Sequence, residues 1–86
     1  MADNSFELDL VTPEESVFSG KVVSVTAPGD YGSFQVMRDH APMLASLGTG
    51  EVKLVLPNKS EQTYSLSDGF FEVSDNKAIL LAEKIN

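Results

Sequence analysis

The sequence has no cysteine or tryptophan, and His40 is the only histidine among its 86 residues. Without cysteine the chain can form neither a disulfide nor a thiolate zinc site, and one histidine cannot build a multi-histidine metal site. Small secreted domains usually need such cross-links, so the composition favours an intracellular protein. Residues 1–5 also lack the basic and apolar regions of a signal peptide.

Basic residues and long apolar runs are scarce as well. Six basic residues face 13 acidic ones, for a formal net charge of −7, and the basic residues are scattered singly. Because nucleic-acid binders concentrate positive charge, we exclude nucleic acid as a partner. The longest apolar run, 78–82, is far shorter than the about 20 residues of a membrane-spanning helix, so no direct membrane insertion is expected. The acidity serves solubility or attraction to a basic partner surface.

Motifs that carry catalysis or bind nucleotides are missing. The sequence has no G-x-S-x-G elbow, no phosphate-binding G-x-x-x-x-G-K-[ST] loop and no G-x-G-x-x-G turn. Asp39 precedes His40, but adjacent residues of an extended chain point to opposite faces, so the two are expected to make a poor acid–base dyad. We therefore interpret His40 as a packing or partner-contact residue and predict no catalytic residue, no cofactor and no metal site.

Alternation of apolar and polar residues with period two dominates the chain. Each alternating run offers one apolar face, as a half-buried β-strand does. The runs lie at 6–11, 23–26, 33–36, 51–56, 63–66, 70–73 and 78–81. No stretch has the apolar stripe of a helix, although 41–47 could form one helical turn between Pro42 and Gly48. The pattern predicts an all-β protein, a two-sheet β-sandwich, in a single domain over residues 1–86.

Turn residues separate the runs. Pro, Gly, Asn and Asp favour turns because they preset φ, allow positive φ or hydrogen-bond their own backbone. On this basis we predict turns at Ser19-Gly20 and at 27–30, and hairpin turns at 67–69 and 75–77. Phe70 and Phe71 then point to opposite faces of one strand, and we expect one in the core and the other at an interface or beneath a loop.

The segment 32–44 is not explained by alternation alone. It leads from a strand through His40-Ala41-Pro42 into the apolar pair Met43-Leu44. Proline fixes the backbone and keeps Ala41 extended, so the loop is expected to be stiff and to present His40, Met43 and Leu44 in a set direction. A stiff apolar loop without cofactor chemistry indicates a docking surface.

This segment resembles the G-x-F-x-V-x-x-x-H-A-P-[LM]-L motif of the epsilon subunit of F-type ATP synthases. Further stretches resemble the same family in the same order, and together they cover nearly the whole chain. They are the opening strand and turn at 6–14, the F-x-G-x-V step near 17–20, the S-G-G-x-x-E-V step at 66–73 and the closing strand at 79–83.

The resemblance implies a β-sandwich of about ten short strands that acts as a non-catalytic subunit in the central stalk, or rotor. Such a subunit docks on the gamma subunit and on the c-ring, and it helps to couple proton flow to ATP synthesis. By position, the gamma contacts correspond to Thr12, His40, Pro42 and Met43. The c-ring contacts correspond to Asp30, Tyr31, Gly32 and Ser33. The implied location is the cytoplasmic face of the bacterial inner membrane, peripheral and within the ATP synthase complex.

The chain departs from the family pattern at several positions. Ser33 stands where many members have an acidic residue, Arg38-Asp39 replaces Pro-Gly, and Asp68 replaces the middle glycine of the S-G-G step. The C-terminal helical hairpin of typical members, which can inhibit ATP hydrolysis or bind ATP, is absent from the 86 residues. Those two properties are therefore not carried over.

Two other functions compete with the rotor subunit. One is a free-standing sandwich that binds carbohydrate or peptide, with Tyr31 as an exposed aromatic. The other is a small hydrolase or isomerase, for which the Asp39-His40 pair is the only support.

Overall fold

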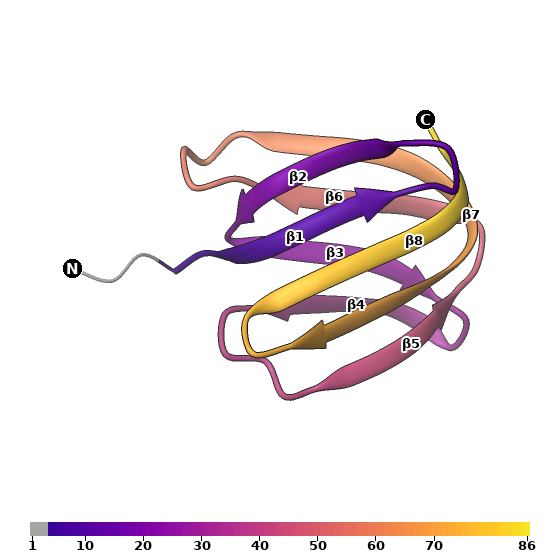
Figure 1. The fold of residues 1–86 in the computed structure, drawn as a ribbon. Coiled ribbons are helices and arrows are strands. Elements are labelled where there is room, and N and C mark those ends of the chain that lie inside the picture. Colours follow the sequence, from indigo (N-terminus) through magenta and orange to yellow (C-terminus); the bar gives the residue numbers. More distant parts are fainter. Residues whose placement is uncertain (1–3) are drawn as a thin grey trace.

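A computed structural model describes residues 4–86 and shows eight strands and no helix within that range (Figure 1). Residues 1–3, where no secretory signal is predicted, lie outside the described residues. The strands are β1 (Phe6–Val11), β2 (Ser16–Val22), β3 (Ser24–Gly29), β4 (Gly32–Met37), β5 (Met43–Leu47), β6 (Gly50–Val55), β7 (Glu61–Ser74) and β8 (Lys77–Ile85).

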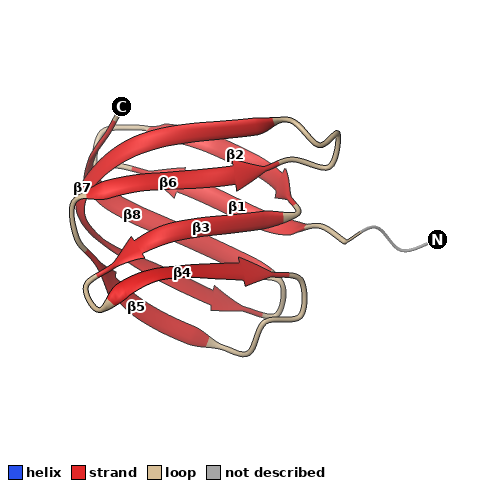
Figure 2. Cartoon of the chain, turned by 180° about the vertical axis from the view of Figure 1, so that it is seen from behind, coloured by secondary structure: helices blue, strands red, loops and turns tan. Residues whose placement is uncertain are grey.

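The strands form one hydrogen-bonded sheet that folds over into two layers (Figures 1 and 2). Strands β2, β1, β8, the second half of β7, and β5 make one layer. Strands β4, β3, β6 and the first half of β7 make the other. All pairs are antiparallel except β1 with β8, which are parallel. The predicted all-β sandwich is confirmed, with its two sheets joined at a corner.

That corner accounts for one strand of the difference between the eight described strands and the expected ten or so. Strand β7 pairs with β6 through Leu66 and with β5 from Gly69 onward, and its register with β8 is the same on both sides of Asp68. Asp68 has a φ of 47°, which bends the strand without reversing it. The predicted hairpin at 67–69 is therefore wrong. The turn residues there bend one long strand across both layers.

Two strands, β2 and β5, were not predicted from the sequence. Ser19 and Gly20 lie inside β2, opposite Asp9 and Leu8, and make no turn. Residues 43–47, considered as part of a helical turn, form β5 along the second half of β7. Both segments have weak alternation of their own, and pairing with β1 and β7 decides their conformation.

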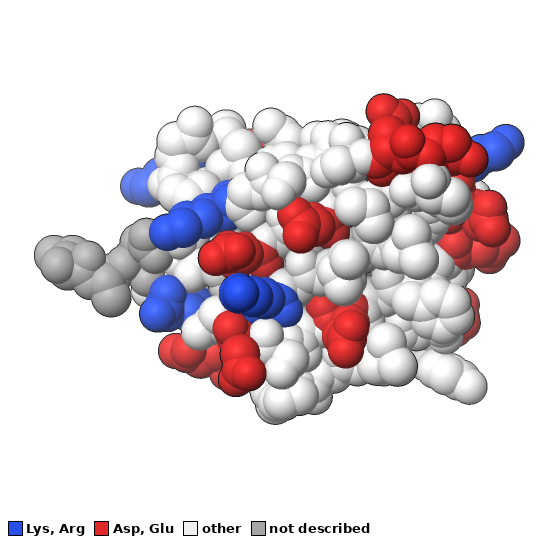
Figure 3. All heavy atoms as spheres, viewed as in Figure 1, with Lys and Arg blue, Asp and Glu red and all other residues white. Residues whose placement is uncertain are grey.

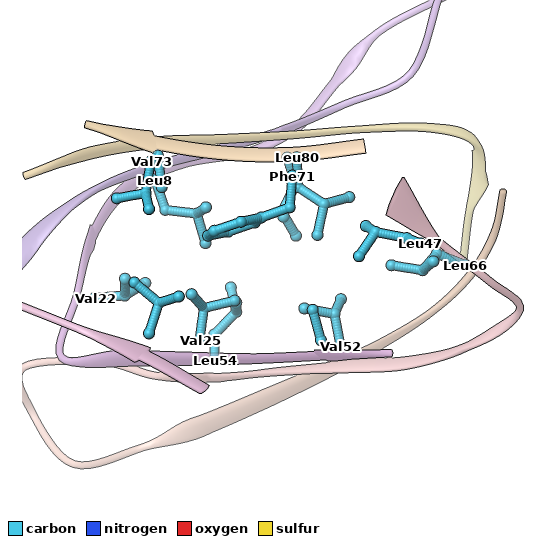
Figure 4. Packing of buried hydrophobic residues seen from close by; sticks show 14 of the residues in the cluster. Leu8, Val22, Val25, Leu47, Val52, Leu54, Leu66, Phe71, Val73 and Leu80 are labelled. Atoms are coloured by element: carbon cyan, nitrogen blue, oxygen red, sulfur yellow. The ribbon is translucent and has the colours of Figure 1, made fainter. Parts of the chain in front are cut away.

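The core fills the space between the layers (Figure 4). Its largest fully buried side chains are Phe71, Leu8, Leu10, Leu54 and Leu80. All five belong to the predicted alternating runs, and the expected apolar face is the buried one in the runs of Leu8, Leu54 and Phe71. In the last run, which alternates Ile79 and Leu81 with Ala78 and Leu80, the expected face of Ile79 and Leu81 is wrong, because these two are exposed and Leu80 is buried. Phe71 also contacts Phe34 edge-on across the sandwich, with ring centroids 5.4 Å apart and planes at 65°.

No helix among the described residues has the length and apolar character needed to cross a membrane.

Candidate protein-interaction surfaces

The strand directions place the predicted contact residues at opposite ends of a molecule about 37 Å long. His40 and Pro42 lie between β4 and β5, at the end where β7 turns into β8. Asp30 and Tyr31 lie at the other end, between β3 and β4. Thr12 follows β1 and therefore belongs to the Asp30 end (Figure 1). The four predicted gamma contacts thus do not form one cluster, because Thr12 is separated from the other three by the length of the sandwich.

The His40 loop is held by its neighbours and not by Pro42 alone. Asp39 N–H donates to Asn76 Oδ1 over 2.7 Å, and Asn76 Nδ2 donates to Asp39 Oδ1 over 3.0 Å. His40 N–H donates to Met37 O at 3.2 Å, and the ring nitrogen Nδ1 of His40 lies 2.7 Å from Ala41 O. Asp39, with φ 65°, sits in a turn, so the expectation of an extended chain there is wrong. The Asp39 carboxylate and the His40 ring face different partners.

Met43 and Leu44 differ in exposure. Met43 is partly buried, packs against the core and pairs with Val73. Leu44 points outward and is 71% exposed. Of the apolar pair that follows Pro42, Leu44 is therefore the residue that is free to contact a partner.

At the opposite end, the β3–β4 turn has a fixed shape. Asp30 N–H donates to Ser46 O at 3.1 Å, and Asp30 Oδ2 accepts from the Ser46 hydroxyl at 2.6 Å. Gly32 has a φ of 129°, which a side chain would strain. Tyr31 between them is fully exposed, and Ser33 is exposed as well. The turn therefore presents Tyr31 on a rigid base.

The Thr12 hydroxyl stabilises the turn in which Thr12 lies. Thr12 Oγ1 accepts from Glu14 N–H at 3.3 Å and from Glu15 N–H at 3.2 Å. This shapes the β1–β2 connection and places Glu14 and Glu15 in solvent.

An apolar patch, called here the apolar face, lies on the outside of the layer that contains β5, β7, β8 and β1, and Glu72 lies within it, opposite both Leu44 and Ile79. It consists of Leu44, Phe70, Ile79 and Leu81, which are all exposed large hydrophobic residues. Phe70 lies opposite Leu81, and Leu81 lies opposite Val11. Figure 3 shows a largely uncharged area over the right half of this face, with acidic side chains around it. Exposed apolar clusters of this kind mark interaction sites.

A groove of about 360 Å³ lies where the apolar face meets the Asp30 end. Phe70, Leu81 and Ala82 contribute apolar surface to it, and three carboxylates line it. These belong to Asp30, Asp68 and Glu83. No group of three or more His, Asp or Glu side chains within residues 4–86 is arranged to hold a metal ion.

Sequence reasoning selected the docking loop but not the apolar face. The signal was present, because the closing run Ile79-Leu80-Leu81 and the pair Phe70-Phe71 are apolar on both faces of their strands. A half-buried strand needs only one apolar face. The prediction that one phenylalanine of the pair is core is confirmed by Phe71, and the exposed Phe70 lies on the apolar face and not beneath a loop.

Comparison with known proteins agrees with the β-sandwich fold. Residues 5–86 match the model of the family described as ATP synthase, delta/epsilon chain, β-sandwich domain. The chain is 54% identical over 85 residues to the ATP synthase epsilon chain of Chlorobium limicola, covering 99% of this chain and 97% of that one. It is 53% identical over 85 residues to the epsilon chain of Chlorobaculum tepidum, with the same coverage. These relatives give no support to a free-standing carbohydrate- or peptide-binding module.

Solved structures share the fold at much lower identity. A chain of the Euglena gracilis mitochondrial ATP synthase structure, OSCP/F1/c-ring, superposes with a TM-score of 0.90 at 18% identity, over 100% of this chain and 54% of that chain. A chain of the Tetrahymena thermophila mitochondrial ATP synthase structure, central stalk/c-ring, gives 0.80 at 17% identity, over 93% and 64%. At such identities the likeness establishes the fold.

Proposed function

The chain belongs to the family of ATP synthase delta/epsilon chains, as their β-sandwich domain, and on that premise we propose that it is a non-catalytic central-stalk subunit of an F-type ATP synthase. In this role it docks on the gamma subunit and on the c-ring and helps to couple proton flow to ATP synthesis. The observation that carries the proposal is the identity of 54% over nearly the full length of a chain described as an ATP synthase epsilon chain.

The apolar face is the part of the molecule best suited to the gamma subunit. Its four exposed hydrophobic residues need a covering surface, and burying them favours association by about 25 cal/mol per Å² of apolar area. Thr12 and the His40 loop lie at the two ends of the molecule, so a gamma subunit that runs along the long axis can reach both. Met43 then supports the interface from beneath, while Leu44 makes the contact.

The Asp30 end is suited to the c-ring. Tyr31 projects from a turn that Ser46 and Gly32 hold in shape, and Asp30 and Ser33 flank it. The Asp30 carboxylate beside this tip complements basic loops on the ring. The mechanical role follows from the fold, because a bent sheet around one core transmits force between its two docking surfaces with little deformation. The proposed location is the cytoplasmic face of the bacterial inner membrane, peripheral and within the complex.

A binding experiment with the gamma subunit of the same organism tests the proposal. The full chain should be retained by immobilised gamma, and Leu44→Glu should abolish most of the retention because it places a charge on the apolar face. Thr63→Glu is the matched control, since Thr63 is exposed on the first half of β7, in the other layer. Wild-type chain that gamma does not retain, or equal retention of both variants, contradicts the proposal.

A further inference from the structure

The groove beside the apolar face combines an apolar floor with an acidic rim. Phe70 and Leu81 lie side by side across β7 and β8 at its floor, and both are exposed. Asp68 and Glu83, two positions further along the same strands, stand at its rim. Asp30 closes the rim from the β3–β4 turn.

Two of these carboxylates oppose each other. Ser67 pairs with Lys84 and Gly69 pairs with Ala82, so the register places Asp68 across from Glu83, although the ladder has no pair between these two residues. Like charges directly opposite each other destabilise a sheet. No lysine or arginine belongs to the part of the chain that lines the groove. Asp68 also adopts a φ of 47°, which most residues avoid. The chain thus maintains two adjacent negative charges without a cation of its own in the groove.

The third carboxylate is held in place. The Ser46 hydroxyl donates to Asp30 Oδ2 at 2.6 Å, and the Asp30 backbone N–H donates to Ser46 O at 3.1 Å. The other carboxylate oxygen, Asp30 Oδ1, lies next to Gly48. A rim carboxylate with a fixed position loses little freedom when it binds a cation.

The geometry of the groove favours one kind of cation over others. The described carboxylates do not make a metal-binding group, which disfavours a compact ion. An arginine side chain has an apolar stem that can lie on Leu81, a planar guanidinium that stacks on an aromatic ring such as Phe70, and several donors for carboxylates. Lysine offers a point charge without the planar surface.

We propose that this groove is the receptor for an arginine side chain of the gamma subunit. The assignment to gamma rests on the proposed function and on continuity, because Phe70 and Leu81 belong both to the groove floor and to the apolar face. Of the turn assigned to the c-ring, Asp30 lines the groove, whereas Tyr31, Gly32 and Ser33 do not. The arginine anchors one end of the gamma interface and neutralises the opposed pair Asp68 and Glu83.

The first experiment measures binding of the full chain to gamma at low and high salt by calorimetry. The double variant Asp68→Asn/Glu83→Gln removes both charges and keeps the shapes, and asparagine tolerates the positive φ. We expect the Kd to rise about tenfold at low salt and most of its salt dependence to disappear. Asp75→Asn is the control, because Asp75 also has positive φ, at 52°, but lies in the β7–β8 turn at the other end.

Binding and salt dependence like those of the wild type in the double variant overturn the proposal. Unchanged gamma binding with weaker binding to the c-ring overturns it too, since the groove would then serve the ring.

The second experiment does not depend on gamma and therefore separates this inference from the proposed function. N-acetyl-arginine amide at millimolar concentration should shift the backbone NMR signals of Gly69, Phe70 and Ala82 in the wild type but not in the double variant. N-acetyl-citrulline amide, the uncharged isostere, should leave them in place. Equal shifts with both probes, or none with either, contradict an arginine receptor even if gamma binds.

Discussion

Asp39 and Asn76 hold each other through two hydrogen bonds although they are 37 residues apart in the chain. Asp39 lies in the β4–β5 loop and Asn76 in the β7–β8 turn, and both have positive φ, 65° and 60°. The backbone N–H of Asp39 and the side-chain amide of Asn76 each act as a donor. The pair therefore attaches the β4–β5 loop, which carries His40, to the β7–β8 turn in the second half of the chain.

Replacing Asn76 should loosen this end of the molecule. Asn76→Ala loses both hydrogen bonds and forces alanine into a left-handed conformation, so we expect the free energy of unfolding to fall by about 2 kcal/mol in urea titration. Asn76→Gly loses the same bonds without the backbone strain and should cost about half as much. Equal stability of the two variants and the wild type would show that the loop does not depend on this pair.

Gly69 should not accept a side chain. A Cβ at this position would clash with Leu81 O and would lie 3.0 Å from Ala82 Cα, both backbone atoms of β8. We expect Gly69→Ala to lower the free energy of unfolding by about 3 kcal/mol, because the corner of the sheet must open. Gly20→Ala is the comparison, since its Cβ would meet the Phe18 ring at an ordinary 3.5 Å. A loss as large at Gly20 as at Gly69 would contradict the close approach of β7 and β8.

Met43 and Leu44 should respond differently to the same change. Met43→Glu buries a charge against the core and should lower the thermal unfolding midpoint by roughly 10 °C or more. Leu44→Glu changes an exposed position, should leave the midpoint within about 2 °C, and should still weaken gamma binding. Circular dichroism melts together with gamma retention separate the two effects. A large loss of stability in Leu44→Glu would remove Leu44 from the proposed interface.

Tyr31→Ala should affect docking at the tip and nothing else. The side chain is fully exposed, so we expect the free energy of unfolding to change by no more than about 0.5 kcal/mol. Retention by gamma should stay at the wild-type level, and co-sedimentation with detergent-solubilised c-ring should decrease. Undiminished c-ring binding of this variant would exclude Tyr31 from the c-ring contact.

Much of the fold could be predicted because alternation and burial coincide. Leu8, Leu54 and Phe71 occupy the apolar positions of their runs, and all are buried. The last run is apolar on both faces, so alternation alone could not show that Leu80 is buried and Leu81 exposed. The number of strands could not be obtained in this way. Asp68-Gly69 has the composition of a hairpin turn, and only the register of β7 with β8, which is the same before and after Asp68, shows that the chain bends there and continues.

The candidate sites were predicted less completely, for a related reason. The His40 and Asp30 segments stand out in the sequence, but their separation to opposite ends, and the position of Thr12 at the same end as Asp30, follow from strand directions. The groove brings Asp30, Asp68 and Glu83 together from three separate strands or turns. No local pattern predicts such a meeting, because it depends on the register between strands.

Reconstitution of ATP-driven proton pumping tests the central claim most directly. Membrane vesicles that contain the ATP synthase without this subunit should regain pumping when the wild-type chain or Thr63→Glu is added. They should not regain pumping with Leu44→Glu, which we expect to fold because Leu44 is exposed. Failure of the wild-type chain to restore pumping, or full restoration by Leu44→Glu, would contradict a rotor subunit that docks through its apolar face.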